Sequence, residues 1–246
     1  MSEKIYPIGI QNFEKIRKEG YFYIDKTALI YRLVKTGSYY FLSRPRRFGK
    51  SLLISTLDAY FRGERDLFEG LAIEKLEKDW VKRPVLHIDL NIGKYDAPDS
   101  LDKILNEALV KWETVFGTGA GESTLALRFK GVVERAYKQS GQRVAILVDE
   151  YDKPLLQAIG DEELQREYRN TLKPFYGVLK TMDGCIQFAM LTGVTKFGKV
   201  SVFSDLNNLE DLSMWIEFVT LCGVSNQEIH ADRIMREVIP VIPFFQ

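Results

Sequence analysis

Residues 44–51 form a basic loop that ends in Gly49, Lys50 and Ser51. The loop fits the Walker A pattern G-x-x-x-x-G-K-[ST] except at its first position, where Arg44 stands in place of glycine. Gly49 lets the backbone approach a phosphate, and the N–H groups that open the following helix form a cradle for an anion. Lys50 would reach the β- and γ-phosphates, and the Ser51 hydroxyl would ligate Mg²⁺. The loop and the first helical turn supply the expected nucleotide-binding residues, which are Arg46, Arg47, Phe48, Gly49, Lys50, Ser51 and Leu52.

Two carboxylates follow a short apolar run in the middle of the chain. The run Val144–Val148 leads directly into Asp149 and Glu150, a pattern typical of the Walker B motif. A buried parallel strand delivers such residues to the edge of the sheet where α/β proteins bind ligands. We expect Asp149 to hold Mg²⁺ through water and Glu150 to orient and polarise the attacking water. The alternative is a strand followed by a solvated acidic turn.

Two further polar residues are candidates near these motifs. Thr192 follows the apolar run Ile186–Leu191, and its hydroxyl could bond to the γ-phosphate or to the attacking water. Threonine is also common at strand ends, so a structural role stays open. Asp152 is either a functional carboxylate or the cap of a helix or turn. The expected catalytic residues are therefore Lys50, Glu150 and Thr192, and the expected metal ligands are Ser51 and Asp149.

The loop concentrates positive charge in a chain that has none overall. Arg44, Arg46, Arg47 and Lys50 lie within seven residues. They could stabilise phosphate charge, contact a second subunit or touch nucleic acid. Other candidate sources of a positive charge acting in trans are Lys196, Lys199, Arg233 and Arg236, whereas the isolated His87 and His230 are expected to be structural.

Other cofactor motifs are missing from the sequence. It contains no G-x-G-x-x-G, G-x-S-x-G or H-E-x-x-H motif. The stretch after Thr195 lacks the aspartate of a guanine-specific [NT]-K-x-D motif, so adenine is favoured by default.

Short apolar runs alternate with amphipathic stretches and predict the elements that position these residues. Strands are expected at 38–42, 85–90, 144–148 and 186–191, with helices at 27–34, 50–61, 100–116, 123–139 and 162–182. Gly117–Gly121 reads as a loop between two helices. The tail predicts a turn at 206–209, a last strand at 215–221 and a helix that begins at Ser225 with a capping box to Glu228. Almost wholly apolar strands in this alternation indicate an α/β protein with a mainly parallel sheet covered on both faces.

Composition limits the classes of function. The 246 residues are 46% hydrophobic and include 34 basic and 34 acidic residues, so attraction to nucleic acid or to an anionic membrane does not dominate. Cys185 and Cys222 fit neither a disulfide framework nor a zinc site. The sequence shows neither a signal peptide nor an apolar run of about 20 residues, so we expect a cytoplasmic protein without a membrane span. The apolar, proline-containing end at 239–246 is typical of a fragment or a truncated form.

Five segments together resemble the AAA-ATPase-like family. They are Tyr6–Phe13, Phe22–Thr27, Ser43–Ser51, Asp149–Pro154 and Leu191–Phe197. The resemblance implies a P-loop ATPase core with an additional strand between the phosphate loop and the Asp-Glu strand. It also implies that Lys50, Ser51, Asp149 and Glu150 take the roles given above, and that Asp25-Lys26-Thr27 lies near the nucleotide. Full-length members of the family commonly carry a C-terminal domain similar to restriction-endonuclease-like nucleases, and Leu221-Cys222-Gly223 resembles the start of the family's lid.

We therefore expect a P-loop NTPase of the three-layer α/β/α type with an additional strand and a catalytic glutamate. Its expected parts are an N-terminal extension at 1–37, the ATPase core at 38–223 and the start of a truncated lid or C-terminal region at 224–246. The leading hypothesis is ATP binding with Mg²⁺-dependent hydrolysis that drives a conformational switch. The expected partners beside ATP are a second copy or a nuclease-type domain, with nucleic acid left open. The alternative is a catalytically weak or inactive P-loop interaction module, motivated by Arg44 and the C-terminal end.

Overall fold

Five parallel strands form the centre of the protein, whose structure is a computed structural model that describes residues 5–196, 209–224 and 228. The sheet order is β2-β3-β4-β1-β5, and every pair of neighbours is parallel. The strands are β1 (Tyr39–Ser43), β2 (Val85–Asp89), β3 (Val144–Asp149), β4 (Ile186–Gly193) and β5 (Glu210–Asp211). Strand β4 therefore lies between β1 and β3. This order confirms the α/β class and the additional strand between the phosphate loop and the Asp-Glu strand.

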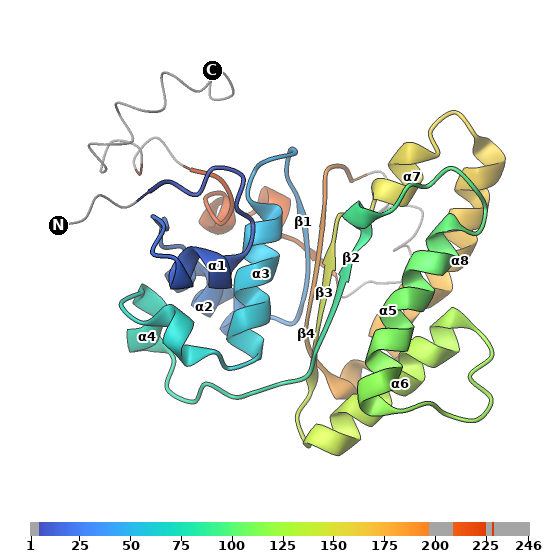
Figure 1. Cartoon of the computed structure of the whole chain (residues 1–246), viewed down its shortest axis with the longest axis horizontal. Coiled ribbons are helices and arrows are strands. Elements are labelled where there is room, and N and C mark those ends of the chain that lie inside the picture. The colour runs from blue at the N-terminus through green and yellow to red at the C-terminus, as the bar shows by residue number, and fades with distance from the viewer. Residues whose placement is uncertain (1–4, 197–208, 225–227, 229–246) are drawn as a thin grey trace.

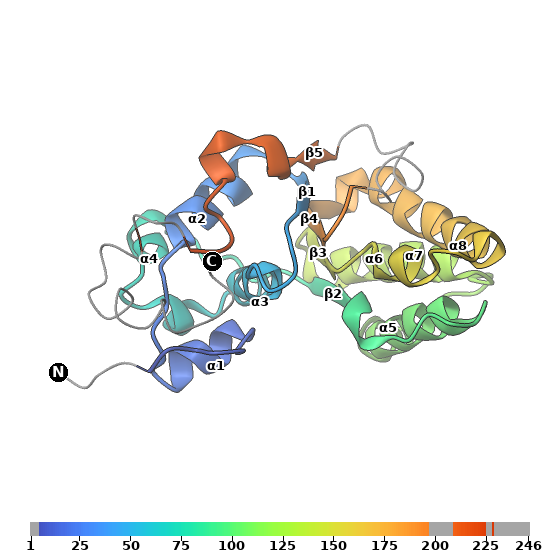
Figure 2. The same ribbon diagram turned by 90° about the horizontal axis from the view of Figure 1, so that it is seen from above.

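Helices cover both faces of the sheet, as Figures 1 and 2 show. One side carries α1 (Phe13–Lys18), α2 (Thr27–Thr36), α3 (Lys50–Phe61) and α4 (Ala72–Leu76). The other carries α5 (Ser100–Phe116), α6 (Leu125–Ser140), α7 (Lys153–Gln157) and α8 (Glu162–Thr181). Short 3₁₀ helices are η1 (Arg65–Phe68), η2 (Leu90–Ile92), η3 (Asp183–Cys185), η4 (Leu212–Met214) and η5 (Ile216–Phe218).

Alternate residues of the strands feed two separate hydrophobic cores. In β3, Ile146 and Val148 pack with α5, α6 and α8, whereas Ala145 and Leu147 pack with α2 and α3. All six residues of β3 are buried. Because successive side chains of a strand point to opposite faces, a strand covered on both sides must be apolar throughout. This is the physical basis of the three-layer sandwich.

Helix ends follow the local sequence signals. The Thr124 side chain accepts a hydrogen bond from the Leu127 N–H and caps α6, which ends at Gly141 in the left-handed conformation. The Asp161 side chain caps α8 in the same way through the Leu164 N–H. The loop expected at 117–121 does separate α5 from α6. These signals explain why the predicted helices match the observed ones to within one or two residues.

The N-terminal segment packs on the layer formed by α3. Phe13 is fully buried, and its N–H donates to Ser55 Oγ at 2.9 Å. The Asp25 carboxylate accepts from the N–H groups of Thr27 (2.8 Å) and Ala72 (2.7 Å), and Thr27 Oγ1 accepts from the Ile73 N–H at 3.1 Å. Asp25 and Thr27 thus hold the start of α4. Lys26 forms an ion pair with Glu228.

The prediction of a strand at 215–221 is wrong. This stretch contains η5 and a turn, and the last strand is β5, which has two residues. The aromatic and β-branched residues favoured a strand, but Phe218 and Leu221 are buried while Ile216 is 89% exposed. Burial three residues apart fits a 3₁₀ turn rather than the alternation of a strand. Apart from Leu209 and Glu228, the turn at 206–209, the helix from Ser225 and the end at 239–246 lie outside the described residues.

Among the described residues no helix is long and apolar enough to span a membrane. Cys185 and Cys222 are free thiols.

Candidate functional site

The basic loop joins the end of β1 to the start of α3. Gly49 has φ +84° and immediately precedes the helix, a conformation that glycine adopts without strain. Lys50 is only 3% exposed, and its Nζ donates to the carbonyl oxygens of Arg44 (3.0 Å) and Pro45 (3.2 Å). The ammonium group therefore lies against the loop, close to the N–H groups that begin α3. This is the arrangement that a phosphate-binding loop requires.

Arg44 stands where the Walker A pattern has its first glycine, and it is half-buried. Its Nη1 donates to the carbonyl oxygens of Ser43 (3.0 Å) and Ser213 (3.4 Å). The Ser43 N–H in turn donates to Ser213 Oγ at 2.8 Å. Arg44 thus connects the phosphate loop to η4. Nothing in the sequence signalled this contact, because the two residues are 169 positions apart.

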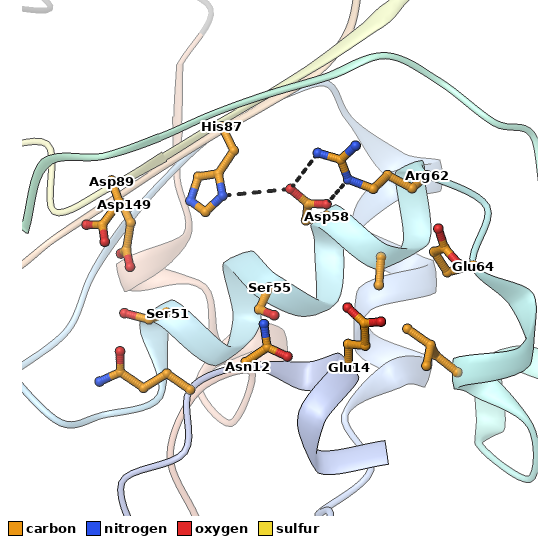
Figure 3. A pocket seen from close by; sticks show the side chains of 13 residues that line it. Asn12, Glu14, Ser51, Ser55, Asp58, Arg62, Glu64, His87, Asp89 and Asp149 are labelled. Carbon is orange, nitrogen blue, oxygen red and sulfur yellow. Dashed lines mark hydrogen bonds and ion pairs between the residues drawn. The ribbon is translucent and has the colours of Figure 1, made fainter. Parts of the chain in front are cut away.

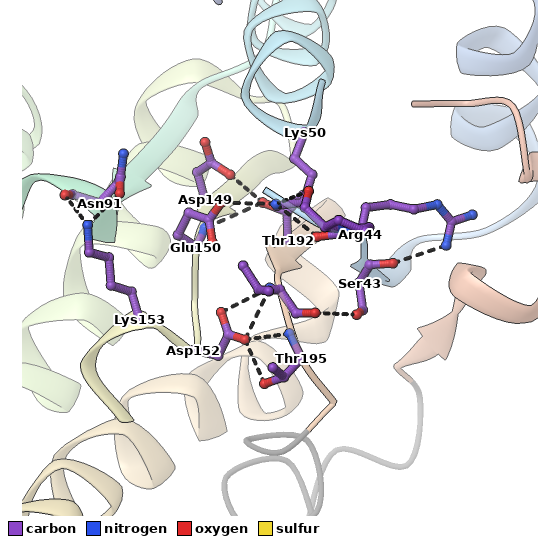
Figure 4. Close-up of polar contacts among 12 residues, drawn as sticks. Ser43, Arg44, Lys50, Asn91, Asp149, Glu150, Asp152, Lys153, Thr192 and Thr195 are labelled. Carbon is purple, nitrogen blue, oxygen red and sulfur yellow. Dashed lines mark hydrogen bonds and ion pairs between the residues drawn. The ribbon is translucent and has the colours of Figure 1, made fainter. Parts of the chain in front are cut away.

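The structure brings together Asp149, Glu150 and Thr192 at the adjacent ends of β3 and β4. Asp149 is 4% exposed, and the Thr192 hydroxyl donates to its Oδ1. The Glu150 N–H donates to Thr192 Oγ1 at 3.4 Å. Glu150 Oε1 lies 3.0 Å from Lys50 Nζ, as Figure 4 shows. Three of the predicted residues therefore meet the lysine of the phosphate loop at one edge of the sheet.

Glu150 is unusual in its backbone and its charge. It has φ +55°, the left-handed conformation that residues with a side chain rarely adopt. Burial raises the pKa of its carboxyl, and the ion pair with Lys50 opposes this rise. The neighbouring carboxylates Asp149 and Asp152 raise the pKa further, so the net shift is upward. Strained backbone and a shifted pKa at the same residue are features that cluster at functional sites.

A cavity of about 380 Å³ opens beside Ser51 and Asp149 (Figure 3). It continues along α3 past Ser55 and Asp58, and the end of β2 adds His87 and Asp89. The cavity therefore offers a hydroxyl and a carboxylate from two different elements. Mg²⁺ in proteins is commonly bound by one or two such oxygen ligands and keeps several waters. Among the described residues no group of three or more His, Cys, Asp or Glu side chains is placed to bind a metal alone.

His87 contacts Asp58, with Nδ1 3.7 Å from Oδ2, and Asp58 also pairs with Arg62. These partners fit the structural role expected for His87. In Figure 3, His87 lies beside Asp89, and its imidazole points along the cavity toward Asp58.

The three residues after Glu150 are all hydrogen-bonded to other segments, and Figure 4 shows the contacts of Asp152 and Lys153. The Tyr151 hydroxyl donates to the Thr195 carbonyl oxygen at 2.9 Å. The Asp152 carboxylate accepts from the N–H groups of Val194 and Thr195, and Lys153 Nζ donates to Asn91 Oδ1 at 2.5 Å. The loop after β3 is thus attached to the chain that follows both neighbouring strands.

Other predicted residues lie apart from this group. Arg46, Arg47 and Phe48 are exposed on the loop, and Leu52, in the first turn of α3, is partly buried against the core. Lys196 Nζ lies 3.1 Å from Asp211 Oδ2, so it connects to β5. The candidates Lys199, His230, Arg233 and Arg236 lie outside the described residues.

The strand order and the loop between β1 and α3 define an α/β protein of the P-loop NTPase-like class. Residues 7–203 match the family model described as predicted AAA-ATPase, and the chain belongs to that family. This match confirms the family resemblance found in the sequence, and it does not include a nuclease domain.

The chain is also 43% identical over 233 residues to a protein described as the uncharacterized protein in the vnfD 5′ region of Azotobacter chroococcum mcd 1. The aligned region covers 94% of this chain and 45% of that relative, so the chain spans less than half of its length.

Proposed function

We propose that this protein binds ATP with Mg²⁺ and hydrolyses the γ-phosphate. The observation that carries the proposal is the meeting of Lys50, Asp149, Glu150 and Thr192 where β1, β3 and β4 end. Membership of the predicted AAA-ATPase family supports the same nucleotide. Lys50 would bind the β- and γ-phosphates, helped by the N–H groups of the loop and of the start of α3.

The cation would be held by the Ser51 hydroxyl and, through water, by Asp149. Both residues line the cavity of about 380 Å³ beside the loop. The hydrogen bond from Thr192 fixes the Asp149 carboxylate, which leaves its second oxygen for this task. When bound, Mg²⁺ neutralises part of the phosphate charge.

Glu150 would act on the attacking water. It accepts a proton as the water oxygen bonds to the γ-phosphorus, and the bond from that phosphorus to the bridging oxygen breaks to give ADP and phosphate. In the structure the Glu150 carboxylate pairs with Lys50. Binding of phosphate at Lys50 would release Glu150, so nucleotide state and the conformation of this edge are linked. This linkage is the proposed conformational switch.

Calorimetric titration with ATP, with and without Mg²⁺, tests binding, and release of phosphate tests turnover. Lys50→Ala should weaken ATP binding at least about tenfold because a buried charge partner of the phosphates is lost. Glu150→Gln should keep binding and lose turnover. Glu107→Gln, on the exposed face of α5, is the control for folding and handling. Turnover that persists in both site variants would refute the assignment, and binding without turnover in the wild type would favour the interaction module.

A second candidate is nucleic-acid binding by the exposed part of the loop. Arg46 and Arg47 both lie on the surface next to the proposed nucleotide site. Binding of DNA that weakens with salt and disappears on replacing both arginines by alanine would support this candidate. Binding that is unchanged in the double variant would assign the arginines another role.

A further inference from the structure

Asp152 is a buried carboxylate with more partners than a turn cap needs. It is 1% exposed, and four hydrogen bonds from two residues reach it. The Val194 N–H donates to both of its oxygens (3.2 and 3.1 Å). The Thr195 N–H and hydroxyl donate to Oδ2 at 2.7 and 2.8 Å. Although Asp152 immediately precedes α7, its side chain accepts no N–H of that helix. A helix-capping role is therefore excluded.

Tyr151 fixes the same loop to the same strand. Its N–H donates to the Thr192 carbonyl oxygen at 2.8 Å, and its hydroxyl donates to the Thr195 carbonyl oxygen at 2.9 Å. Its ring packs edge-on against Phe41, with the ring centroids 5.3 Å apart. A side chain at Gly193 would overlap the Tyr151 ring and the Asp152 carboxylate. The loop after β3 and the chain after β4 thus pack directly on each other.

Glu150 stands immediately before these two attached residues. Its φ of +55° is a conformation that persists only where the surrounding structure holds it. On its C-terminal side, the hydrogen bonds of the Tyr151 N–H and hydroxyl and of the Asp152 carboxylate all end on residues 192–195. On its N-terminal side, Asp149 is bonded to Thr192. One short stretch of chain therefore holds the residues on both sides of Glu150.

We propose that Asp152 is a positioning residue that keeps Glu150 in its left-handed conformation by tying the loop to Val194 and Thr195. This inference rests on the proposed role of Glu150 in hydrolysis. It adds a regulatory consequence: a movement of the chain after β4 would change the position of Glu150. The same movement would also reach the start of the loop after β1, because Ser43 Oγ donates to the Val194 carbonyl oxygen at 3.0 Å. Asp152 does not contact Lys50 or Ser51 in any of its hydrogen bonds. Its removal should therefore affect turnover and leave nucleotide binding intact.

Asp152→Asn is the sharpest change. The amide keeps the size of the side chain but has one acceptor oxygen, so its NH₂ group would face an N–H donor of Val194 or Thr195. Asp161→Asn is the matched control. Asp161 caps the start of α8, and asparagine caps a helix about as well as aspartate does. Displacement of a catalytic group by about 1 Å can cost about 100-fold in rate. We expect kcat to fall about 10- to 100-fold in Asp152→Asn, with KM and the ATP dissociation constant within about threefold of wild type.

A double-mutant cycle separates positioning from a general loss of structure. If Asp152 acts through Glu150, then Asp152→Asn should cause no further loss of the residual turnover in a Glu150→Gln background. Losses that multiply in the double variant would overturn the proposal, as would a wild-type kcat in Asp152→Asn. Should Asp152→Asn not fold, Thr195→Val removes only the hydroxyl donor and should give a smaller fall in kcat with the same lack of additivity.

Amide hydrogen exchange of the nucleotide-free chain tests the positioning independently of turnover. The Tyr151 N–H bonds to the Thr192 carbonyl, which the substitution does not alter. Faster exchange at Tyr151 in Asp152→Asn, with unchanged exchange in α5 and α6, would show that the loop is released. Wild-type exchange at Tyr151 would overturn the proposal. If the wild type binds no ATP, the proposed function fails, and this exchange measurement still decides whether Asp152 holds Glu150.

Discussion

Lys50 and Glu150 form an ion pair, with Nζ 3.0 Å from Oε1, at the site proposed for the phosphates. The lysine belongs to the loop after β1, and the glutamate follows β3, which is separated from β1 by β4. Two groups with different proposed tasks thus form an ion pair with each other. A phosphate must compete with the Glu150 carboxylate for the ammonium group. This competition makes the affinity for ATP sensitive to the charge at position 150.

Glu150→Gln should therefore bind ATP more tightly than the wild type. The amide removes both a competitor for Lys50 and a negative charge that repels the phosphates. The expected gain is about 3- to 10-fold in the dissociation constant, or about 1 kcal/mol. Calorimetry with ATP and Mg²⁺ measures it, and Glu150→Asp, which keeps the charge, is the control. Weaker binding by the glutamine variant would show that the carboxylate helps to bind the nucleotide.

Thr192→Val should change the dependence of turnover on Mg²⁺. Valine has nearly the same shape, but it cannot donate to Asp149 or accept from the Glu150 N–H. Asp149 would lose the hydrogen bond that orients it, so a higher Mg²⁺ concentration should be needed for half-maximal turnover. The free energy of unfolding should fall by about 1–2 kcal/mol because a buried partner is left without its bond. Thr192→Ser should restore both properties, and an unchanged Mg²⁺ dependence in the valine variant would refute the role.

Much of the fold could be predicted because its signals are local. The apolar runs of β1 to β4 and the periodicity of the longer helices predicted these elements to within a few residues, whereas the short elements α1, α4, α7 and β5 were not predicted. The loop from Arg44 to Ser51 and the pair Asp149-Glu150 follow strands that the same local signals predict, so their meeting at one sheet edge followed from parallel pairing. The insertion of β4 between β1 and β3 came from the family resemblance, since the spacing of elements does not determine the order of strands in a sheet.

The contacts that organise the site could not be predicted, because they join distant parts of the chain. Asp152 meets Val194, and Arg44 meets Ser213, across 42 and 169 residues. The sequence marked Asp152 as a functional carboxylate or a cap and Arg44 as the departure from the Walker A pattern, but it indicated neither of these contacts. The segment after Trp215 was predicted wrongly because strand-forming residues there are buried at a spacing of three. Local preference gives way to tertiary packing in such short segments.

Arg44→Gly tests whether the arginine in the phosphate loop is a structural connection. Glycine restores the usual Walker A residue but removes the hydrogen bonds to the Ser43 and Ser213 carbonyls. We expect a loss of about 1 kcal/mol in the free energy of unfolding and faster amide exchange in residues 209–224. Arg46→Gly, at an exposed position of the same loop, is the control and should change neither. Equal stabilities of the two variants would show that the contact with Ser213 contributes nothing.

Glu77 provides a test of stability against pH at a site far from the proposed chemistry. The carboxylate is 4% exposed; its Oε2 lies 2.8 Å from Lys35 Nζ and accepts from the Tyr60 hydroxyl at 2.5 Å. Burial alone would raise the pKa of Glu77, but the bonds from Lys35, Tyr60 and the backbone outweigh it, so the pKa is lowered from 4.5. A group whose pKa is lower in the folded state stabilises the fold above its unfolded pKa, and this contribution is lost as pH falls through the folded pKa. Glu77→Gln should therefore lower the free energy of unfolding by roughly 2 kcal/mol at pH 7. This difference in stability from the wild type should shrink steadily below about pH 4.5.

Urea unfolding of both proteins at several pH values between 3 and 7 measures the difference in stability, with Glu107→Gln as the exposed control. A difference that stays constant across this range would mean that the charge of Glu77 does not stabilise the fold.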